Sequence, residues 1–378
     1  MKSMKAIVNG KILLPDREVN DQALLFDRTI QGVVSRPAEG CEIIDAGGDY
    51  VSPGFVDVHI HGYLGADASD GEAEGLKTMA EGILRNGVTS FLPTTMTIPW
   101  KELEKAFQTI REVMPETREE GFAGAEIMGC HAEGPFINPA KKGAQEEGAI
   151  LPPEAERILP YADIIRLITV APEMPGAIEC IEKLGGRMAV SIGHTNGNYK
   201  QIKAGLSAGA NHFTHLFNAM TGLHHRDPGA VGAALSGEAW CELIADTFHV
   251  NPELYPLLDR CQGERLVLIT DCTRAGGLGD GQYTLGGQPI WVEGIACRLK
   301  DGTIAGSVLK MNEAVRNYRD HARVPMYEAA ACASTHPAES VGIGERKGSL
   351  LPGRDADILI LDENCTVRKV FRRGRRVF

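Results

Sequence analysis

Apolar runs and helix-like stretches alternate along the middle of the chain. Eight short runs are rich in β-branched and aliphatic residues, which is typical of buried strands. Strands that alternate with helices indicate a parallel sheet, and eight such repeats predict an α/β fold, a (β/α)8 TIM barrel. The expected strands are Gly54–His59, Val88–Pro93, Glu126–Cys130, Ile164–Val170, Arg187–Ile192, Ala210–Thr214, Cys241–Ala245 and Leu266–Thr270.

The two ends of the chain differ from this middle segment. Residues 1–52 and 347–378 contain short β-like runs broken by glycine turns. We therefore expect the barrel to occupy residues 53–346, between two β-rich segments. Its connections carry the apolar spacing of helices at Glu72–Asn86, Trp100–Met114, Pro175–Leu184, Tyr199–Ala208 and Pro252–Cys261. After the eighth run come β-like turns near residues 283–299 and then an amphipathic stretch, Met311–His321.

Chemically capable side chains follow the apolar runs again and again. In (β/α)8 barrels the carboxyl ends of the strands form the active site. Independent core histidines are not expected to fall at that one position so often. The residues that do so are His59, His61, Glu133, His194, His215 and Asp271.

The first of these positions holds a His-x-His pair. His59 and His61 stand two residues apart on a strand, so both imidazoles face the same side and can grip one divalent ion. Gly62 follows and leaves room for a cofactor. A lone His-x-His is more often two packed histidines without a metal. The metal-binding interpretation therefore depends on other potential ligands nearby.

Glu133, His194 and His215 are the other potential ligands. Alone, Glu133 is better interpreted as an acidic loop residue, and each histidine as a hydrogen-bonded core residue. Together, one carboxylate and four imidazoles form a nitrogen and oxygen ligand set suited to Zn²⁺ or Fe²⁺. We expect one or two divalent ions per subunit, with Glu133 able to bridge two.

Asp271 ends the run Leu-Val-Leu-Ile-Thr-Asp. A carboxylate beside a metal is a natural general base for an attacking water, and it can return the proton to the leaving group. The alternative is an N-cap for the following turn, which leaves the other side chains unexplained.

Composition and charge exclude several classes of protein. The chain has 378 residues, of which 43% are hydrophobic and 24% charged, and a net charge of −11, which argues against general nucleic-acid binding. Nine scattered cysteines without a CxxC pair indicate reduced thiols rather than a disulfide framework. We see no signal peptide and no apolar run of ~18 residues that could span a membrane. A cytoplasmic, soluble protein is expected.

Several motifs resemble the amidohydrolase superfamily and, within it, the N-acetylglucosamine-6-phosphate deacetylase family. They span most of the chain in order. They are Pro-Gly-Phe-Val-Asp-Val-His-Ile-His-Gly, Gly-Val-Thr-Ser-Phe-Leu-Pro-Thr, His-Ala-Glu-Gly-Pro-Phe-Ile-Asn, Lys-Lys-Gly-Ala, Ile-Gly-His-Thr, Thr-His-Leu-Phe-Asn-Ala-Met, Arg-Asp-Pro-Gly, Ile-Ala-Asp-Thr-Phe-His, Ile-Thr-Asp and Ala-Gly-Ser-Val-Leu. The resemblance implies that both chain ends build one small β-sandwich domain.

The resemblance also implies a role for each site residue. Glu133, His194 and His215 would hold the metal that every member keeps, His59 and His61 would complete a second metal site, and Asp271 would be the catalytic acid and base. The reaction implied is removal of the acetyl group from N-acetylglucosamine-6-phosphate, in a homodimer whose Arg226 reaches the neighbouring site. The residues implied to bind the sugar phosphate are Ala144, Gln145, Asn218, Ala219, Arg226, His249, Ala305 and Gly306.

Gln145 departs from the pattern, because many members have a histidine there. A glutamine donates a hydrogen bond but carries no charge, so a second metal could supply the missing polarisation, or the preferred amino sugar could differ. The alternative substrates are N-acetylgalactosamine-6-phosphate and another N-acyl or cyclic amide. The third hypothesis is a non-catalytic scaffold, which the complete ligand set argues against.

Overall fold

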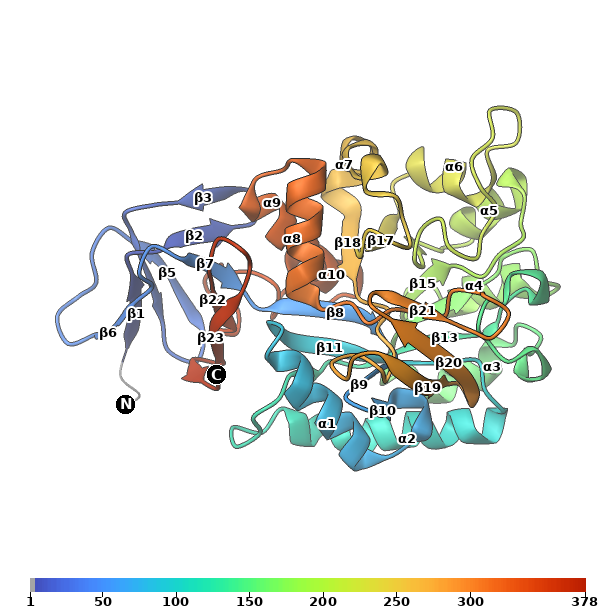
Figure 1. The fold of residues 1–378 in the computed structure, drawn as a ribbon, viewed down its shortest axis with the longest axis horizontal. Helices are drawn as coiled ribbons and strands as arrows, with labels where there is room; N and C mark the ends of the chain where they lie inside the picture. Colours follow the sequence, from blue (N-terminus) through green and yellow to red (C-terminus); the bar gives the residue numbers. More distant parts are fainter. Residues whose placement is uncertain (1–3) are drawn as a thin grey trace.

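The computed structural model describes residues 4–378, and its larger part is the predicted barrel (Figure 1). Its parallel strands follow one another around the sheet, and nearly every residue in them is buried. They are β8 (Phe55–Ile60), β11 (Val88–Thr95), β13 (Cys130–Phe136), β14 (Ile165–Val170), β15 (Ala189–Ile192), β16 (His212–Phe213), β17 (Trp240–Ile244) and β18 (Leu266–Ile269).

The barrel nearly closes between its first and last strands. β8 pairs in parallel with β11, and β18 packs against its other side. The Asp271 amide, two residues after β18, donates a hydrogen bond of 2.9 Å to the carbonyl of His59 in β8. The closure therefore brings the His-x-His pair next to Asp271.

Helices cover the outside of the barrel, as predicted. The apolar stripe of α2, for example, buries Leu103, Phe107 and Ile110 at helical spacing. The helices are α1 (Ala73–Leu84), α2 (Trp100–Thr117), α3 (Ala155–Ile158), α4 (Ala177–Leu184), α5 (Tyr199–Ser207), α6 (Gly229–Leu235), α7 (Tyr255–Gln262), α8 (Met311–Ala322), α9 (Met326–Cys332) and α10 (Thr335–Ser340). Among residues 4–378, none of these helices has the length and apolar character of a membrane span.

The two chain ends form two further sheets, which make up the β-rich lobe at the left of Figure 1. One sheet, with the order β5-β4-β1-β6, comes from the amino-terminal segment alone. The other has the order β24-β23-β22-β7-β2-β3, and it joins three strands from each end of the chain where β22 pairs with β7. This confirms the small terminal β-domain, whereas the exact boundaries at residues 52 and 346 stay predictions. The strands are β1 (Lys5–Val8), β2 (Lys11–Leu14), β3 (Arg17–Val19), β4 (Ala23–Phe26), β5 (Ile30–Val34), β6 (Glu42–Asp45), β7 (Tyr50–Pro53), β22 (Ile358–Leu361), β23 (Val367–Arg372) and β24 (Arg375–Arg376).

Two local predictions need correction. The third barrel strand was expected at Glu126–Cys130, but those residues form the short β12 (Glu126–Ile127) and only the start of β13, so Glu133 lies inside a strand. Gly62 was expected to leave room for a cofactor. Instead, a Cβ there would lie 2.5 Å from the Arg274 amide nitrogen, so this glycine allows two backbone segments to pack closely.

A three-stranded antiparallel sheet follows β18, where the β-like turns were expected. It consists of β19 (Gly281–Leu285), β20 (Gln288–Glu293) and β21 (Ala296–Arg298). The Gln288 side chain donates a hydrogen bond of 2.8 Å to the Ala144 carbonyl, which ties the sheet to the loop after β13. Leu285 at the end of β19 reaches the cavity described next.

Candidate metal and catalytic site

The six side chains singled out in the sequence converge at the carboxyl end of the barrel. Five of them line a cavity of about 360 Å³, and His59 lies buried directly beneath it. A larger hollow of about 790 Å³ lies beside the amino ends of β17 and β18, but it contains none of the six. The chemistry predicted from the sequence therefore belongs to the smaller cavity.

Glu133, His194 and His215 form the first group of potential ligands. The Nε2 atoms of the two imidazoles lie 3.1 Å apart, and they lie 3.1 and 3.0 Å from Oε1 of Glu133. All three side chains are buried. The Nδ1 atom of His194 lies 2.8 Å from the Lys141 carbonyl oxygen, so Nδ1 donates a hydrogen bond to it. The lone pair of Nε2 is then the one that can bind a metal.

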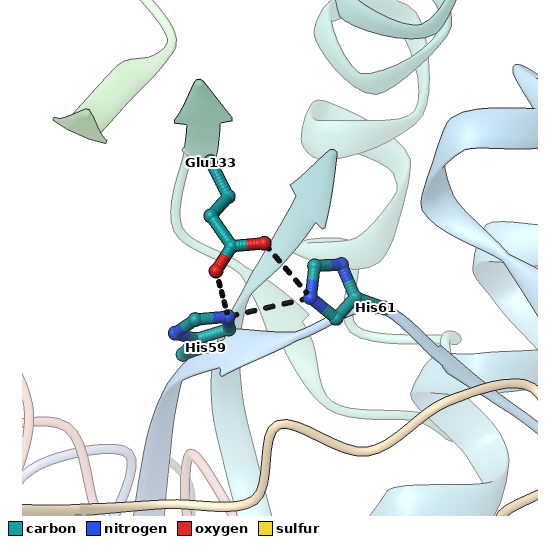
Figure 2. A group of neighbouring side chains, drawn as sticks. All are labelled: His59, His61 and Glu133. Carbon is teal, nitrogen blue, oxygen red and sulfur yellow. Dashed lines mark hydrogen bonds and ion pairs between the residues drawn. The ribbon is translucent and has the colours of Figure 1, made fainter. Parts of the chain in front are cut away.

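His59, His61 and Glu133 form the second group (Figure 2). The two Nε2 atoms are 3.3 Å apart, and they approach different oxygens of Glu133, at 3.5 Å for His59 and 3.3 Å for His61. Figure 2 shows the two carboxylate oxygens of Glu133 directed at different rings, one at His59 and the other at His61. Because Glu133 takes part in both groups, it is placed to bridge two ions.

The spacing of these donor atoms fits a common metal ion. Ligand atoms about 2.0–2.1 Å from a tetrahedral Zn²⁺ lie roughly 3.3 Å from one another. The separations within each group, from 3.0 to 3.5 Å, match that value. Imidazole nitrogens and a carboxylate also suit Zn²⁺ or Fe²⁺.

The electrostatics of the cluster favour positive charge. Burial would lower the pKa of His59, but the carboxylates of Glu242, Glu133 and Asp271 raise it to about 9. Burial would raise the pKa of Glu133, but the neighbouring His194 and His59 hold it well below its usual value. Without a metal, protonated imidazoles balance the negative charge of these carboxylates. A bound divalent ion would replace those protons as the source of positive charge.

Asp271 faces both histidines of the second group. Its Oδ1 lies 3.2 Å from Nε2 of His61 and 3.6 Å from Nε2 of His59. Burial would raise the pKa of Asp271, but the charges of these two imidazoles lower it to about 2. The side chain is therefore an ionised base at neutral pH, and it lines the cavity.

Three of the candidate residues adopt backbone conformations that side chains disfavour. The φ angles of His194, His215 and Asp271 are 46°, 31° and 49°, all in the left-handed region. Such strained positions cluster at functional sites, where the surrounding structure holds them. Each lies just after its barrel strand, and the sharp turn directs its side chain over the strand ends.

Most of the predicted substrate-binding residues line the same cavity. They are Ala144, Gln145, Asn218, Ala219, His249 and Gly306. Ala305 is buried but is not part of the lining, so only its neighbour Gly306 faces the cavity. Arg226 lies on an exposed loop before α6, where its guanidinium contacts His225, and it does not reach the cavity of its own chain.

Sequence reasoning missed other residues of the site. Lys141, Met96, Thr303 and Ile304 also line the cavity. Lys141 belongs to the Lys-Lys-Gly-Ala motif, so its charge was a usable signal. Glu242 was missed as well, although a carboxylate in the middle of an apolar parallel strand is an unusual feature that could have drawn notice.

Gln145 makes two hydrogen bonds that fix its side-chain amide. Its Nε2 donates to Oε2 of Glu133 at 2.5 Å, and its Oε1 accepts from the Thr97 amide at 2.6 Å. The side chain is buried and lines the cavity. In this arrangement Gln145 orients the carboxylate of Glu133.

The chain belongs to the amidohydrolase family, whose pattern matches residues 50–377. The chain is 39% identical to the N-acetylglucosamine-6-phosphate deacetylase of Bacillus subtilis, over 86% of this chain and 84% of that protein. It is 38% identical to the N-acetylgalactosamine-6-phosphate deacetylase of Escherichia coli O157:H7, over 86% of this chain and 87% of that protein.

A solved structure shares the whole fold. It is that of a mutant N-acetyl-D-glucosamine-6-phosphate deacetylase from Mycobacterium smegmatis in complex with N-acetyl-D-glucosamine-6-phosphate. The TM-score is 0.89 at 29% identity, and the match covers 99% of each chain. The barrel and the terminal β-domain are thus both features of this group of enzymes.

Proposed function

We propose that this protein is a metal-dependent deacetylase of N-acetylglucosamine-6-phosphate, which it hydrolyses to glucosamine-6-phosphate and acetate. The observation that carries the proposal is the convergence of Asp271 with two groups of metal ligands around one cavity. The names of the related enzymes support the substrate class. The intact ligand set argues against a non-catalytic scaffold.

We assign the two groups of ligands to two divalent ions, Zn²⁺ or Fe²⁺. Glu133, His194 and His215 would hold one, and His59 and His61 would hold the other, with Glu133 shared. When bound, such ions supply Lewis-acid polarisation of the amide carbonyl and lower the pKa of a water molecule.

Asp271 is proposed to move the proton. Its ionised Oδ1 accepts a proton from the attacking water and then delivers it to the amide nitrogen as the carbon–nitrogen bond breaks. Gln145 keeps Glu133 oriented during this step through the hydrogen bond described above. The buried surroundings strengthen each of these electrostatic interactions.

The other end of the cavity is proposed to bind the sugar phosphate. His249 lines it, and its Nδ1 donates to Oδ2 of Asp246 at 2.6 Å, so Nε2 remains available to a ligand. Lys141, which carries a positive charge, and Asn218 and Ala219 also line the cavity. The cavity thus offers a cationic residue and hydrogen-bonding groups in addition to the metal ligands and Asp271.

The acetyl-release reaction tests this proposal directly. We expect purified, metal-loaded protein to release acetate from N-acetylglucosamine-6-phosphate. The 6-phosphate of N-acetylgalactosamine is the second substrate to assay, because the relative from E. coli O157:H7 is almost as similar as that from B. subtilis. The proposal would be wrong if neither sugar phosphate released acetate. Turnover of a cyclic amide or another N-acyl compound would then indicate the alternative amidohydrolase activity.

Metal stoichiometry is expected to reach two divalent ions per chain. His59→Ala should retain one ion, because the Glu133, His194 and His215 group stays intact. His194→Ala and His215→Ala should each lose the ion of that group. Elemental analysis after metal loading and dialysis measures this, with the exposed His321→Ala as a control that keeps both ions. A wild type that never exceeds one ion would contradict the two-ion assignment.

Arg226 is proposed to act in the neighbouring site of a homodimer. Arg226→Ala and Asp271→Asn chains are each expected to be poorly active, but mixed dimers should contain one complete site. Random assembly of equal amounts should restore roughly a quarter of the wild-type activity. The control replaces the Asp271→Asn chain with an Arg226→Ala, Asp271→Asn double mutant, which completes no site but keeps the residual activity of Arg226→Ala. If the mixtures are no more active than this control, Arg226 does not contribute to the active site of the neighbouring subunit.

We also propose that the protein works in the cytoplasm without a nucleic-acid or membrane partner. Its nine cysteines are unpaired, which suits a reducing compartment. Its net charge of −11 opposes binding to polyanions.

A further inference from the structure

Glu242 lies in the interior of the barrel, below the cavity, and no step of the proposed reaction uses it. It belongs to β17, its exposure is 0%, and it is not part of the cavity lining. A buried carboxylate needs strong partners, because burying an unpaired charge is costly. Its partners therefore indicate why this position is not apolar like the rest of the strand.

One oxygen of Glu242 contacts both groups of metal ligands. Its Oε2 accepts a hydrogen bond from Nδ1 of His59 at 2.9 Å and from the backbone amide of His215 at 3.0 Å. Its Oε1 lies 3.6 Å from Nε2 of His212, and neither of those two atoms has a hydrogen-bond partner among residues 4–378. The firm contacts of the carboxylate are thus to His59 and His215.

The contact with His59 determines which ring nitrogen can bind a metal. A carboxylate only accepts hydrogen bonds, so Nδ1 of His59 carries a proton, and Nε2 is the nitrogen that can give up its proton and bind a metal. That Nε2 is the atom that faces His61, Glu133 and Asp271. His61 and His194 are oriented by the backbone carbonyls of Thr94 and Lys141, whereas His59 is oriented by a charged side chain.

An additional ion between His59, His131 and Glu242 would be a different explanation for this cluster. The geometry opposes it. Oε2 of Glu242 accepts from both His59 Nδ1 and the His215 amide, so both acceptor positions of that oxygen are filled. The Nε2 of His131 contacts the Thr169 hydroxyl at 2.9 Å, and none of the three side chains lines the cavity through which an ion would enter.

We infer that Glu242 is the positioning residue of the second metal site. It holds His59 in the Nδ1-protonated form and in the orientation that presents Nε2 to the ion shared with His61. This inference rests on the proposed two-ion site. It extends that proposal, because it names the side chain that orients the His-x-His pair for metal binding. Carboxylates that hold a metal-binding histidine in this way raise metal affinity by 10–100-fold in other sites.

The test is metal affinity in Glu242→Gln, measured by competition with a chelator. The amide keeps the shape and can still accept from His59, but it carries no charge. We expect the second ion to bind about 10–100-fold more weakly, while the first ion keeps its affinity within about threefold. The control is Glu126→Gln, which removes an equally buried carboxylate whose partners are Arg346 and Lys347. It should bind both ions as the wild type does.

A double mutant separates positioning from general damage. If Glu242 acts through His59, adding Glu242→Gln to His59→Ala should change the affinity of the remaining ion by less than about threefold. Unchanged binding of both ions in Glu242→Gln, or equal weakening of both, would overturn the inference. A wild type that binds a single ion would overturn the two-ion proposal itself, and this inference with it.

A measurement on the wild type keeps the inference falsifiable if Glu242→Gln does not fold. In protein with ¹⁵N-labelled histidine, the ring of His59, assigned through His59→Ala, should keep its proton on Nδ1 after loading with Zn²⁺, and Nε2 should then carry none. A zinc-loaded His59 that carries its proton on Nε2, or binds metal through Nδ1, would refute the role of Glu242.

Discussion

Asp271→Asn is expected to retain both bound ions and the sugar phosphate but to lose turnover by roughly 10²–10⁴-fold, the usual value of a general acid–base group. The amide has nearly the same shape, yet it can neither accept the proton of the attacking water nor return it to the leaving amine. Steady-state kinetics of acetate release and elemental analysis of the same preparation measure the two quantities separately.

A matched substitution elsewhere serves as the control for Asp271→Asn. Asp163 pairs with Arg111 on the outside of the barrel, so Asp163→Asn should leave kcat within about twofold. If Asp271→Asn itself stayed within threefold of the wild-type kcat, Asp271 would not be the proton carrier. If it lost its metal instead, Asp271 would be a ligand rather than a base.

N-Acetylglucosamine-6-phosphate is expected to exceed unphosphorylated N-acetylglucosamine in kcat/KM by roughly 30- to 4,000-fold. This range corresponds to the ~2–5 kcal/mol that is lost when one member of a buried charge pair is removed. His249 supplies a hydrogen-bonding group from its own chain, and Arg226 is proposed to supply bidentate contacts from the neighbour. Competition between the two sugars in one assay gives the ratio directly.

Substitutions at the phosphate end should reduce that ratio and little else. Arg226→Ala should remove most of the preference while leaving the low activity on the plain sugar within about threefold. Arg17→Ala is the charge-matched control, because Arg17 lies in the terminal β-domain and pairs with Asp16. Equal turnover of the two sugars by the wild type would contradict the assignment of a phosphate site.

The barrel could be predicted from the sequence because buried parallel strands are continuous apolar runs. Each of the eight expected runs overlaps a strand of the structure. The candidate side chains expected at the carboxyl ends of these strands do lie together around one cavity. The error at the third strand arose because the apolar run ends at Cys130, where His131 and Glu133 follow. The strand nevertheless continues through these polar residues, because β13 begins at Cys130 and extends past Glu133.

Other features depend on contacts that no local pattern contains. Glu242 lies in a predicted strand, but only the closed barrel shows that its carboxylate reaches His59, far away in sequence. The two hydrogen bonds of Gln145 likewise depend on Thr97 and Glu133, which come from different strands and loops. The side chain of Gln145 lines the cavity, and its contact with Glu133 could not be deduced from the sequence.

The pairing of β7 with β22 has a consequence for the synthesis of the chain. Pro53 pairs with Ile358 and Tyr50 with Leu361, so an inner strand of the terminal sheet comes from a segment that the ribosome produces about 300 residues later. Until then, one edge of β7 has unpaired backbone groups, and such edges invite contact with other chains. β8, which begins two residues after β7 and leads to His59, is anchored to that unfinished sheet. The nascent protein therefore depends on its last-made strands to secure its first barrel strand, and ribosome-bound intermediates should be good substrates for chaperones.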